Sequence, residues 1–440
     1  MTEAGTADNF LLFSDVHFDP FYDPSLVKAL NASPESAWKG ILSSSSLTSY
    51  PPYGSDSNYA LFESALDSMA ATAGNVSTII YPGDVLSHGF NQDYASLTGD
   101  TSQAGVDSFM QKTVEFFVQE VESRFPNATV IMADGNVDSA LDETGSQPGD
   151  PYLSFTAPII SQAFFKDASD QAAFTAGWSA AGYYAVQPDG PTGLKYIVLN
   201  DNLWFPAPYG DPSAGQAELS WFSSQLADAA QNNQQVYVVA HVPLGANAEA
   251  VASNYAQTGV VAYTGFLDDN FNNAFASLEL QYSSTIAATF FAHTHNDDFR
   301  LITSPDYPGA AELARIAPGI TSYLGNNPGY QIYSYNTQND SLLDETTYSL
   351  NLQSSAPAWG KEYDYAQTYG QSLATPQDWA NVYAGILTNP AALTSYVYNK
   401  NVGAMSNNVI TAANAPIYQL ALAYTTPATF NAAAAGLLSG

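Results

Sequence analysis

Six short runs of mainly apolar residues, with helical patterns between several of them, constrain the fold of this 440-residue chain more than any other feature. The runs have the length of buried strands and cover Phe10–Ser14, Thr78–Tyr81, Thr129–Ala133, Tyr196–Asn200, Val236–Ala240 and Ala288–Ala292. The helical patterns cover about Asn58–Ala73, Val106–Phe125 and Gln216–Ala230. Strands that alternate with helices predict a layered α/β fold.

The composition of the sequence changes after Leu352. Residues 353–357 resemble a linker, and the chain from about residue 358 onward is rich in Ala, Tyr and Asn with helical spacing. We therefore predict a layered domain over residues 8–352 and a small, mostly helical C-terminal subdomain over residues 353–440.

The charge balance excludes some partners and suggests a working environment. The chain has 42 acidic residues and only 10 Lys and Arg, which gives a net charge of −32. Such a surface repels the phosphates of a nucleic-acid duplex, and no apolar stretch approaches the roughly 18 residues that membrane insertion requires. Most carboxylates are neutral near pH 3, so we expect an acidic environment; an ordinary acidic bacterial protein is the alternative.

Cysteine is absent from the chain, which excludes disulfides, thiolate ligands and a cysteine nucleophile. The residues before Asn9 are polar and lead directly into the first predicted strand, so no export signal is visible. The polar, Lys-poor composition nevertheless leads us to expect a secreted or periplasmic protein whose signal peptide is not included in this sequence.

The five histidines of the chain lie close to the ends of the predicted strands. Asp15 and His17 follow the first run, and His293 with His295 follows the last; the i, i+2 spacing points both members of each pair to one side of an extended segment. The other candidates that follow or end a run are Asp84, His88, Asn136 and His241. Ligands of open α/β sheets bind at the carboxyl ends of strands, so we expect one site to collect these residues.

The residue types in this set favour particular metals. Imidazole combined with carboxylate suits Zn, Fe or Mn, whereas Ca and Mg prefer oxygen ligands alone. Two ions roughly 3.5–4 Å apart need about seven side-chain ligands, with one carboxylate between them. The sequence therefore predicts two divalent metal ions, with zinc as the first choice and iron or manganese as alternatives.

Several sequence blocks, taken in order, resemble the calcineurin-like metallophosphoesterase superfamily: FSDVHFDPFYD, YPGDVLSH, ADGNVD, VVAHVPLG and FFAHTHNDD. The spacing of Asp84 and His88, VLNDNLWF at 198–205 and NNPGYQIYSYN at 326–336 are similar to the acid sphingomyelinase-like phosphodiesterase branch. The similarity covers about residues 10–352 and includes neither the saposin-like domain nor the disulfides of true acid sphingomyelinases. It implies a layered β-sandwich fold flanked by helices.

The resemblance also implies roles for individual residues. The first metal would be held by Asp15, His17 and His295, the second by Asn136, His241 and His293, and Asp84 would bridge both. A hydroxide held by the metals would attack phosphorus in line. The implied activity is hydrolysis of phosphodiesters, with phosphomonoesters as a second class and with small soluble phosphoesters favoured over membrane sphingomyelin.

One position departs from the family pattern. The superfamily usually has Gly-Asn-His followed by Asp or Glu, but Val137 stands in place of the His, and a valine cannot protonate a leaving group. Asp138, the usual partner of that His, remains, and His88 is the candidate substitute, so both are predicted catalytic residues; a structural hydrogen bond is the alternative for His88. Val137 also motivates the competing hypothesis of a metal-bearing pseudoenzyme that binds phosphorylated ligands with little turnover.

Other positions carry weaker predictions. By family analogy, Tyr22, Asn202 and Trp204 would line the substrate cleft, with packing as an alternative at least as strong. Asp297 and Asp298 would either orient imidazoles or lie in a solvated loop.

Overall fold

The computed structural model describes residues 7–141, 145–190 and 193–437, and it has two six-stranded sheets at its centre. The first sheet has the order β12-β11-β10-β1-β2-β3 and consists of β1 (Ala7–Leu12), β2 (Thr78–Tyr81), β3 (Thr129–Met132), β10 (Gly329–Asn336), β11 (Leu342–Leu350) and β12 (Trp359–Asp364). The second has the order β4-β5-β6-β7-β9-β8 and consists of β4 (Tyr184–Val186), β5 (Lys195–Val198), β6 (Val236–Val239), β7 (Ile286–Phe291), β8 (Asp298–Ile302) and β9 (Glu312–Ile316).

The two sheets pack face to face. Phe10 of β1 lies between them, with its ring centroid 5.9 Å from that of Tyr237 in β6 and 5.6 Å from that of Phe290 in β7. The neighbours β1, β2 and β3 are parallel, and so are β5, β6 and β7. Buried parallel strands are near-continuous apolar runs, which explains why the six runs of the sequence mark these six strands.

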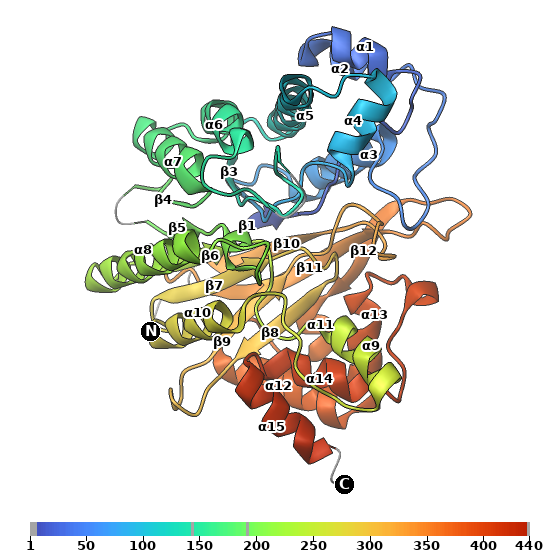
Figure 1. Ribbon diagram of the computed structural model, residues 1–440. Coiled ribbons are helices and arrows are strands. Elements are labelled where there is room, and N and C mark those ends of the chain that lie inside the picture. The colour runs from blue at the N-terminus through green and yellow to red at the C-terminus, as the bar shows by residue number, and fades with distance from the viewer. Residues whose placement is uncertain (1–6, 142–144, 191–192, 438–440) are drawn as a thin grey trace.

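Helices cover the outer faces of both sheets (Figure 1). Those before residue 350 are α1 (Val27–Ala32), α2 (Trp38–Leu42), α3 (Tyr59–Ala73), α4 (Phe90–Thr98), α5 (Gln103–Arg124), α6 (Pro151–Phe164), α7 (Ala168–Ala181), α8 (Pro212–Gln231), α9 (Ala248–Thr258) and α10 (Asp269–Gln281). Capping residues define their starts: Asn58 accepts a hydrogen bond from Leu61 N at α3, and Asp211 accepts from Ser213 N and Ala214 N at α8. The α/β sandwich flanked by helices is thus confirmed.

The C-terminal segment is mostly helical, with α11 (Tyr365–Tyr369), α12 (Pro376–Thr388), α13 (Pro390–Lys400), α14 (Ala415–Ala423) and α15 (Pro427–Leu437). It also contributes β12, which pairs with β11 and forms one edge of the first sheet. The predicted boundary at residue 353 therefore does not separate the C-terminal segment from that sheet, and a self-contained subdomain stays a prediction. Helices α11, α12 and α14 pack against β11, β9 and β8 (orange to red in Figure 1).

No helix among the described residues is both long and apolar enough to cross a membrane.

Candidate metal centre

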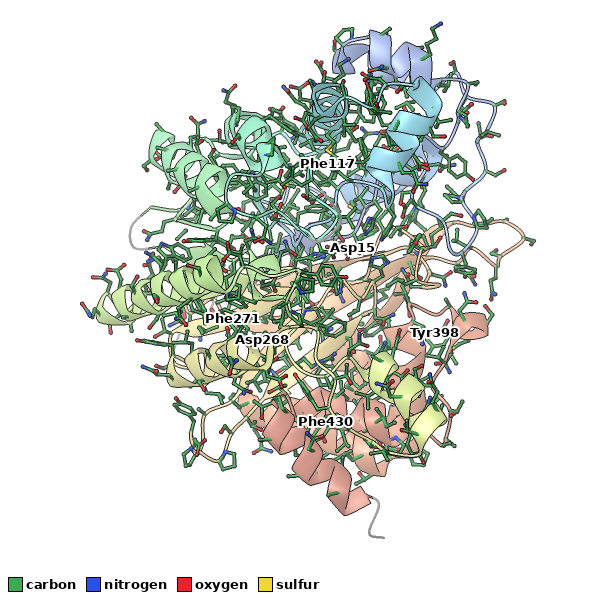
Figure 2. All side chains as sticks on the ribbon, in the orientation of Figure 1. Asp15, Phe117, Asp268, Phe271, Tyr398 and Phe430 are labelled. Atoms are coloured by element: carbon green, nitrogen blue, oxygen red, sulfur yellow. The ribbon has the colours of Figure 1, made fainter. Side chains whose placement is uncertain are left out.

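The seven predicted ligands come together at the carboxyl ends of five strands. They lie in the loops after β1 (Asp15, His17), β2 (Asp84), β3 (Asn136), β6 (His241) and β7 (His293, His295). Asp15 lies near the middle of the molecule, where the two sheets meet (Figure 2). Parallel strands end at the same edge of a sheet, which is why residues so far apart in sequence can meet here.

The backbone is strained at this place. Asp15, His17, Asp84, His293 and His295 have φ angles of 48°, 42°, 65°, 67° and 55°. Only eight non-glycine residues of the described chain have positive φ, so most of this strain is concentrated at one site. Each such residue costs on the order of 1–3 kcal/mol and persists only where the surrounding structure enforces it.

Asp84 occupies the centre of the cluster. Its Oδ2 lies 3.3 Å from His17 Nε2 and 3.1 Å from His241 Nε2, while its Oδ1 accepts a hydrogen bond of 2.9 Å from Val137 N. The same carboxylate oxygen therefore faces imidazoles from both sheets. This geometry fits the bridging position that the family resemblance implies.

The remaining ligands flank Asp84 on two sides. Asn136 Oδ1 lies 2.9 Å from His241 Nε2 and 2.7 Å from His293 Nδ1, and on the other side Asp15 Oδ1 lies 3.6 Å from His295 Nε2. Three overlapping groups of described residues each place three donor atoms within 4.8 Å of one another: Asp15, His17 and His295; Asp15, Asp84 and His241; and His17, Asp56 and His88. The first two groups lie within the predicted ligand set.

Unpaired donor atoms show that the cluster fits cations. Asp15 Oδ2 and His295 Nδ1 are buried and have no hydrogen-bond partner among the described residues. Buried polar atoms are rarely left unsatisfied, and a metal ion would use these lone pairs. The Nδ1 atoms of His17 and His241 lie 2.9 and 2.8 Å from the carbonyl oxygens of Leu86 and Pro82. A proton on each Nδ1 leaves Nε2 free to bind a metal.

In the absence of metal, burial and neighbouring charges shift the pKa values of the imidazoles and of Asp84. Burial lowers the pKa of His17 and His241, but Asp84 outweighs it and raises the pKa values to about 9 and about 10. Burial opposes the ionisation of Asp84, yet His241 and His17 hold its pKa well below the usual range. Metal ions would therefore displace protons from both imidazoles when they bind.

Val137 and Asp138 lie beside the cluster without facing the cavity described below. Val137 is buried and contributes its backbone N–H to Asp84. The carboxylate of Asp138 accepts hydrogen bonds from the backbone N–H groups of Asp84, Val85 and Leu86, at 2.9–3.2 Å. These contacts indicate that Asp138 holds the loop carrying Asp84; the catalytic role predicted for it stays a prediction.

His88 is held at the rim by two residues that the sequence did not suggest. Its Nδ1 lies 3.0 and 3.2 Å from the two carboxylate oxygens of Asp56, which also accepts from His88 N at 2.8 Å. The ring stacks between His17, at a centroid distance of 4.2 Å, and Tyr323, at 3.9 Å. Asp56 lies near a Ser- and Pro-rich loop with no pattern of its own, so sequence carried no signal for this contact.

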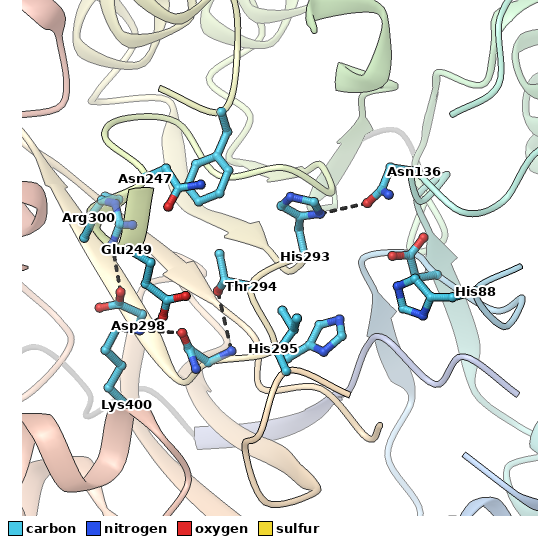
Figure 3. Close-up of a pocket in the computed structure, with 15 residues that line it drawn as sticks. His88, Asn136, Asn247, Glu249, His293, Thr294, His295, Asp298, Arg300 and Lys400 are labelled. Atoms are coloured by element: carbon cyan, nitrogen blue, oxygen red, sulfur yellow. Dashed lines mark hydrogen bonds and ion pairs between the residues drawn. The ribbon is translucent and has the colours of Figure 1, made fainter. Parts of the chain in front are cut away.

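A cavity of about 290 Å³ opens beside the cluster. Asp84 lines this cavity. His88, Asn136, His293 and His295 line one side, and Asn247, Glu249, Asp298, Arg300 and Lys400 line the other (Figure 3). The second group comes from α9, β8 and α13, which places a residue of the C-terminal segment in the same cavity as the predicted metal ligands.

The weaker predictions have mixed outcomes. Asn202 and Trp204 are buried and do not line this cavity; Trp204 packs against Phe271 with ring centroids 6.1 Å apart. Tyr22 lines a neighbouring hollow that also contains His88 and Tyr323. The solvated-loop alternative for Asp297 and Asp298 is wrong, because both are buried and paired with Arg315 and Arg300.

The overlapping groups of donor atoms between the two sheets form a candidate site for two metal ions. Sphingomyelin phosphodiesterase 2 of Caenorhabditis elegans is 26% identical over 368 residues, which cover 79% of this chain and 54% of that protein. Acid sphingomyelinase-like phosphodiesterase 3b of Mus musculus is 26% identical, with 89% of this chain and 82% of that protein covered. Cyclic GMP-AMP phosphodiesterase SMPDL3A of Homo sapiens is 27% identical, with 81% and 74% covered.

These relatives confirm the resemblance to acid sphingomyelinase-like phosphodiesterases and sphingomyelin phosphodiesterases. The chain spans about half the length of the nematode relative. No family model matches the chain. Among solved structures, a dimetal phosphatase from Danio rerio is 10% identical with a TM-score of 0.42, covering 81% of this chain and 99% of its own; a similarity of this size assigns no role to any residue.

Proposed function

We propose that this chain is a metal-dependent phosphoric ester hydrolase that cleaves small soluble phosphodiesters, with phosphomonoesters as a second substrate class. The observation that carries the proposal is the convergence of six other predicted ligands around one buried carboxylate, Asp84, with donor atoms that lack partners among the described residues. The names of the relatives support it, since each is a phosphodiesterase.

Individual residues have separate roles in the proposed hydrolysis. When bound, two divalent ions supply Lewis acidity and activate water near neutral pH, and the His-rich donor set favours zinc. Asp84 and Asn136 keep the imidazoles in place through the contacts described above. His88 faces the cavity and donates its proton to the leaving oxygen, while Asp56 fixes the orientation of its ring.

The size and lining of the cavity support a small, polar substrate. A volume of about 290 Å³ lies at the lower end of ligand sites. Most of the residues that line it are polar, with Phe266 and Leu324 as the large apolar ones. A phosphodiester with compact substituents matches this environment better than a lipid with two acyl chains.

The decisive experiment measures hydrolysis of bis(p-nitrophenyl) phosphate and p-nitrophenyl phosphate between pH 3 and 8, with and without chelator. We expect turnover of the diester that chelator abolishes and added zinc restores. Metal-dependent turnover of neither substrate would instead favour the metal-bearing pseudoenzyme, which Val137 motivates because a valine takes the place of the usual proton donor.

The role of His88 predicts a dependence on the leaving group. Replacing His88 with alanine should slow hydrolysis of an alkyl diester by about 10²–10⁴-fold, the usual contribution of a general acid. A p-nitrophenyl diester should lose much less, because p-nitrophenolate leaves without a proton. Steady-state kinetics on both substrates check this, and an equal loss on both would show that His88 acts only through structure.

Buried carboxyl groups away from the metal centre support acidic working conditions. Glu279 is fully buried in α10; its Oε2 accepts from Thr289 Oγ1 at 2.8 Å, and its Oε1 has no partner among the described residues. Burial raises its pKa from 4.5 to about 8, and burial also raises the pKa of Glu312 well above the usual range. A fold that buries neutral carboxyls suits an acidic, extracytoplasmic location, which we include in the proposal.

A pH dependence of stability follows from Glu279. The folded chain holds this proton up to about pH 8, whereas the unfolded chain releases it near 4.5, so stability falls as pH rises between these values. Between pH 5 and 7 the loss from this group should be about 2–3 kcal/mol. Glu279→Gln cannot ionise and should remove that part of the slope in denaturant unfolding, while the exposed Glu122→Gln should not. An unchanged slope in Glu279→Gln would contradict the burial argument.

A further inference from the structure

Lys400 connects the C-terminal segment to the cavity. It is the last residue of α13, its side chain is only 4% exposed, and it lines the cavity beside the predicted metal ligands. Its Nζ donates to Asn296 Oδ1 and lies 3.5 Å from Glu249 Oε1, and its carbonyl oxygen accepts from Asp297 N at 3.1 Å. A buried ammonium group therefore lies next to the loop that carries His293 and His295.

Two further groups on the same side attract negative charge. Arg300 is buried and lines the cavity; its NH1 donates to Asp298 Oδ2 at 3.0 Å, but its Nε has no partner among the described residues. The N-terminus of α9 also faces the cavity through Ala248 and Glu249, and helix N-termini favour anions. Two of the 10 Lys and Arg residues thus lie in one cavity of a chain with a net charge of −32.

We propose that this wall, in which Lys400, Arg300 and the N-terminus of α9 lie beside Glu249 and Asp298, binds a second anionic group of the substrate, a carboxylate or a phosphate. Figure 3 shows Arg300 and Lys400 on the side of the cavity opposite His88 and Asn136. A substrate whose phosphodiester lies at the metal centre would reach the wall with its other substituent. This inference rests on the proposed phosphodiesterase function and specifies its substrate class.

Glu249 is the residue that such an anion would replace. Its side chain is 57% exposed, and its distance of 3.5 Å from Lys400 Nζ is long for an ion pair. Solvent screening weakens pairs of this kind, so the carboxylate can turn toward water when a ligand anion approaches. The anion would then accept hydrogen bonds from Lys400 and from the first N–H groups of α9.

A purely structural role for Lys400 makes different predictions, and the chain offers a matched control. Lys195 is also 4% exposed and pairs with a carboxylate that is 58% exposed, Asp228, at 3.1 Å. It lies in β5 and does not line the cavity. If Lys400 only fastens α13 to its neighbours, loss of Glu249 should weaken that attachment. If Lys400 binds substrate, loss of Glu249 should make the wall more attractive to anions.

The experiment uses three p-nitrophenyl phosphodiesters that differ only in the second alcohol: ethyl, 2-carboxyethyl and 2-phosphonoethyl. KM and kcat are measured for the wild type and for Lys400→Met, Glu249→Gln and Lys195→Met. For Lys400→Met we expect the KM ratio of the charged to the ethyl diester to rise about 10-fold to 100-fold, the range for hydrogen bonds to charged groups. Glu249→Gln should lower that ratio, and Lys195→Met should leave it unchanged.

Several outcomes would overturn the inference. Equal effects of Lys400→Met on all three diesters, or a ratio that rises in Glu249→Gln, would assign Lys400 to structure alone. A lower KM for the phosphonoethyl than for the carboxyethyl diester would identify phosphate as the preferred anion. If the wild type hydrolyses none of the diesters, the proposed function fails; calorimetry with 3-phosphonopropionate and ethylphosphonate on the zinc-loaded chain still tests the wall, because only the first carries the second anion.

Discussion

Replacing Asp84 with asparagine is expected to lower kcat/KM for bis(p-nitrophenyl) phosphate by about 10²–10⁴-fold. Metal ions contribute several kcal/mol of transition-state stabilisation, and each 1.36 kcal/mol corresponds to about tenfold in rate. In the present structure one oxygen of Asp84 faces both His17 and His241, at 3.3 and 3.1 Å. An amide oxygen carries no full charge and cannot hold two cations side by side, so bound metal should fall from two ions per chain to one or none.

Elemental analysis of the purified variant checks the metal content independently of turnover. Asp134→Asn is the matched control: Asp134 is equally buried just after β3, and its side chain contacts Asn202, 3.5 Å away, and Ser146, whereas Asp84 directly contacts His17 and His241. We expect this control to keep both ions. Two ions in Asp84→Asn, with unchanged kcat/KM, would show that the carboxylate does not bridge metals.

Six of the strands could be predicted because they are short, near-continuous apolar runs, as buried parallel strands usually are. Thr78–Tyr81 was predicted to the residue, and the other five runs end within two residues of the observed strands. Strands β4, β8, β9, β10, β11 and β12 were not predicted. Buried charged residues such as Arg300 and Arg315 interrupt the apolar pattern of β8 and β9, and β11 and β12 alternate between buried and partly exposed residues. The Ala- and Tyr-rich composition around β12 favoured a helix, but pairing with β11 made this segment a strand in spite of that local preference.

The predicted metal centre and the rest of the cavity differ in how much sequence could reveal. Residues such as Asp15 and His293 follow strands directly, so topology alone brings them to one edge. Asp56, Tyr323 and Lys400 reach the site from loops or from α13, through contacts that depend on how those segments fold back. Their local sequence does not indicate that they lie at the site, so these residues around the cavity could not be predicted from sequence.

A buried ionic network joins the metal-ligand loop to both sheets. Arg315 of β9 donates to Asp297, two residues after His295, at 3.1 Å, and lies 2.6 Å from Glu345 Oε2 in β11. The hydroxyl of Tyr363 in β12 lies 2.7 Å from a carboxylate oxygen of both Asp297 and Glu345 and can donate to one of them. One guanidinium therefore balances two carboxylates away from water, and the C-terminal strand completes the arrangement.

Arg315→Met should lower the free energy of unfolding by about 3–5 kcal/mol, because it removes the cation and leaves two buried carboxylates without it. Denaturant unfolding at pH 7 measures the loss. Arg124→Met is the control: Arg124 also contacts Glu63 and Asp67, at 2.8 and 3.0 Å, but its network reaches the surface, and surface pairs contribute about 0–1 kcal/mol. Adding Glu345→Gln to Arg315→Met should recover part of the stability, since one uncompensated charge then disappears. A loss no larger than that of Arg124→Met would mean that the network is hydrated, and that packing between the sheets, rather than this network, fixes the loop carrying His293 and His295.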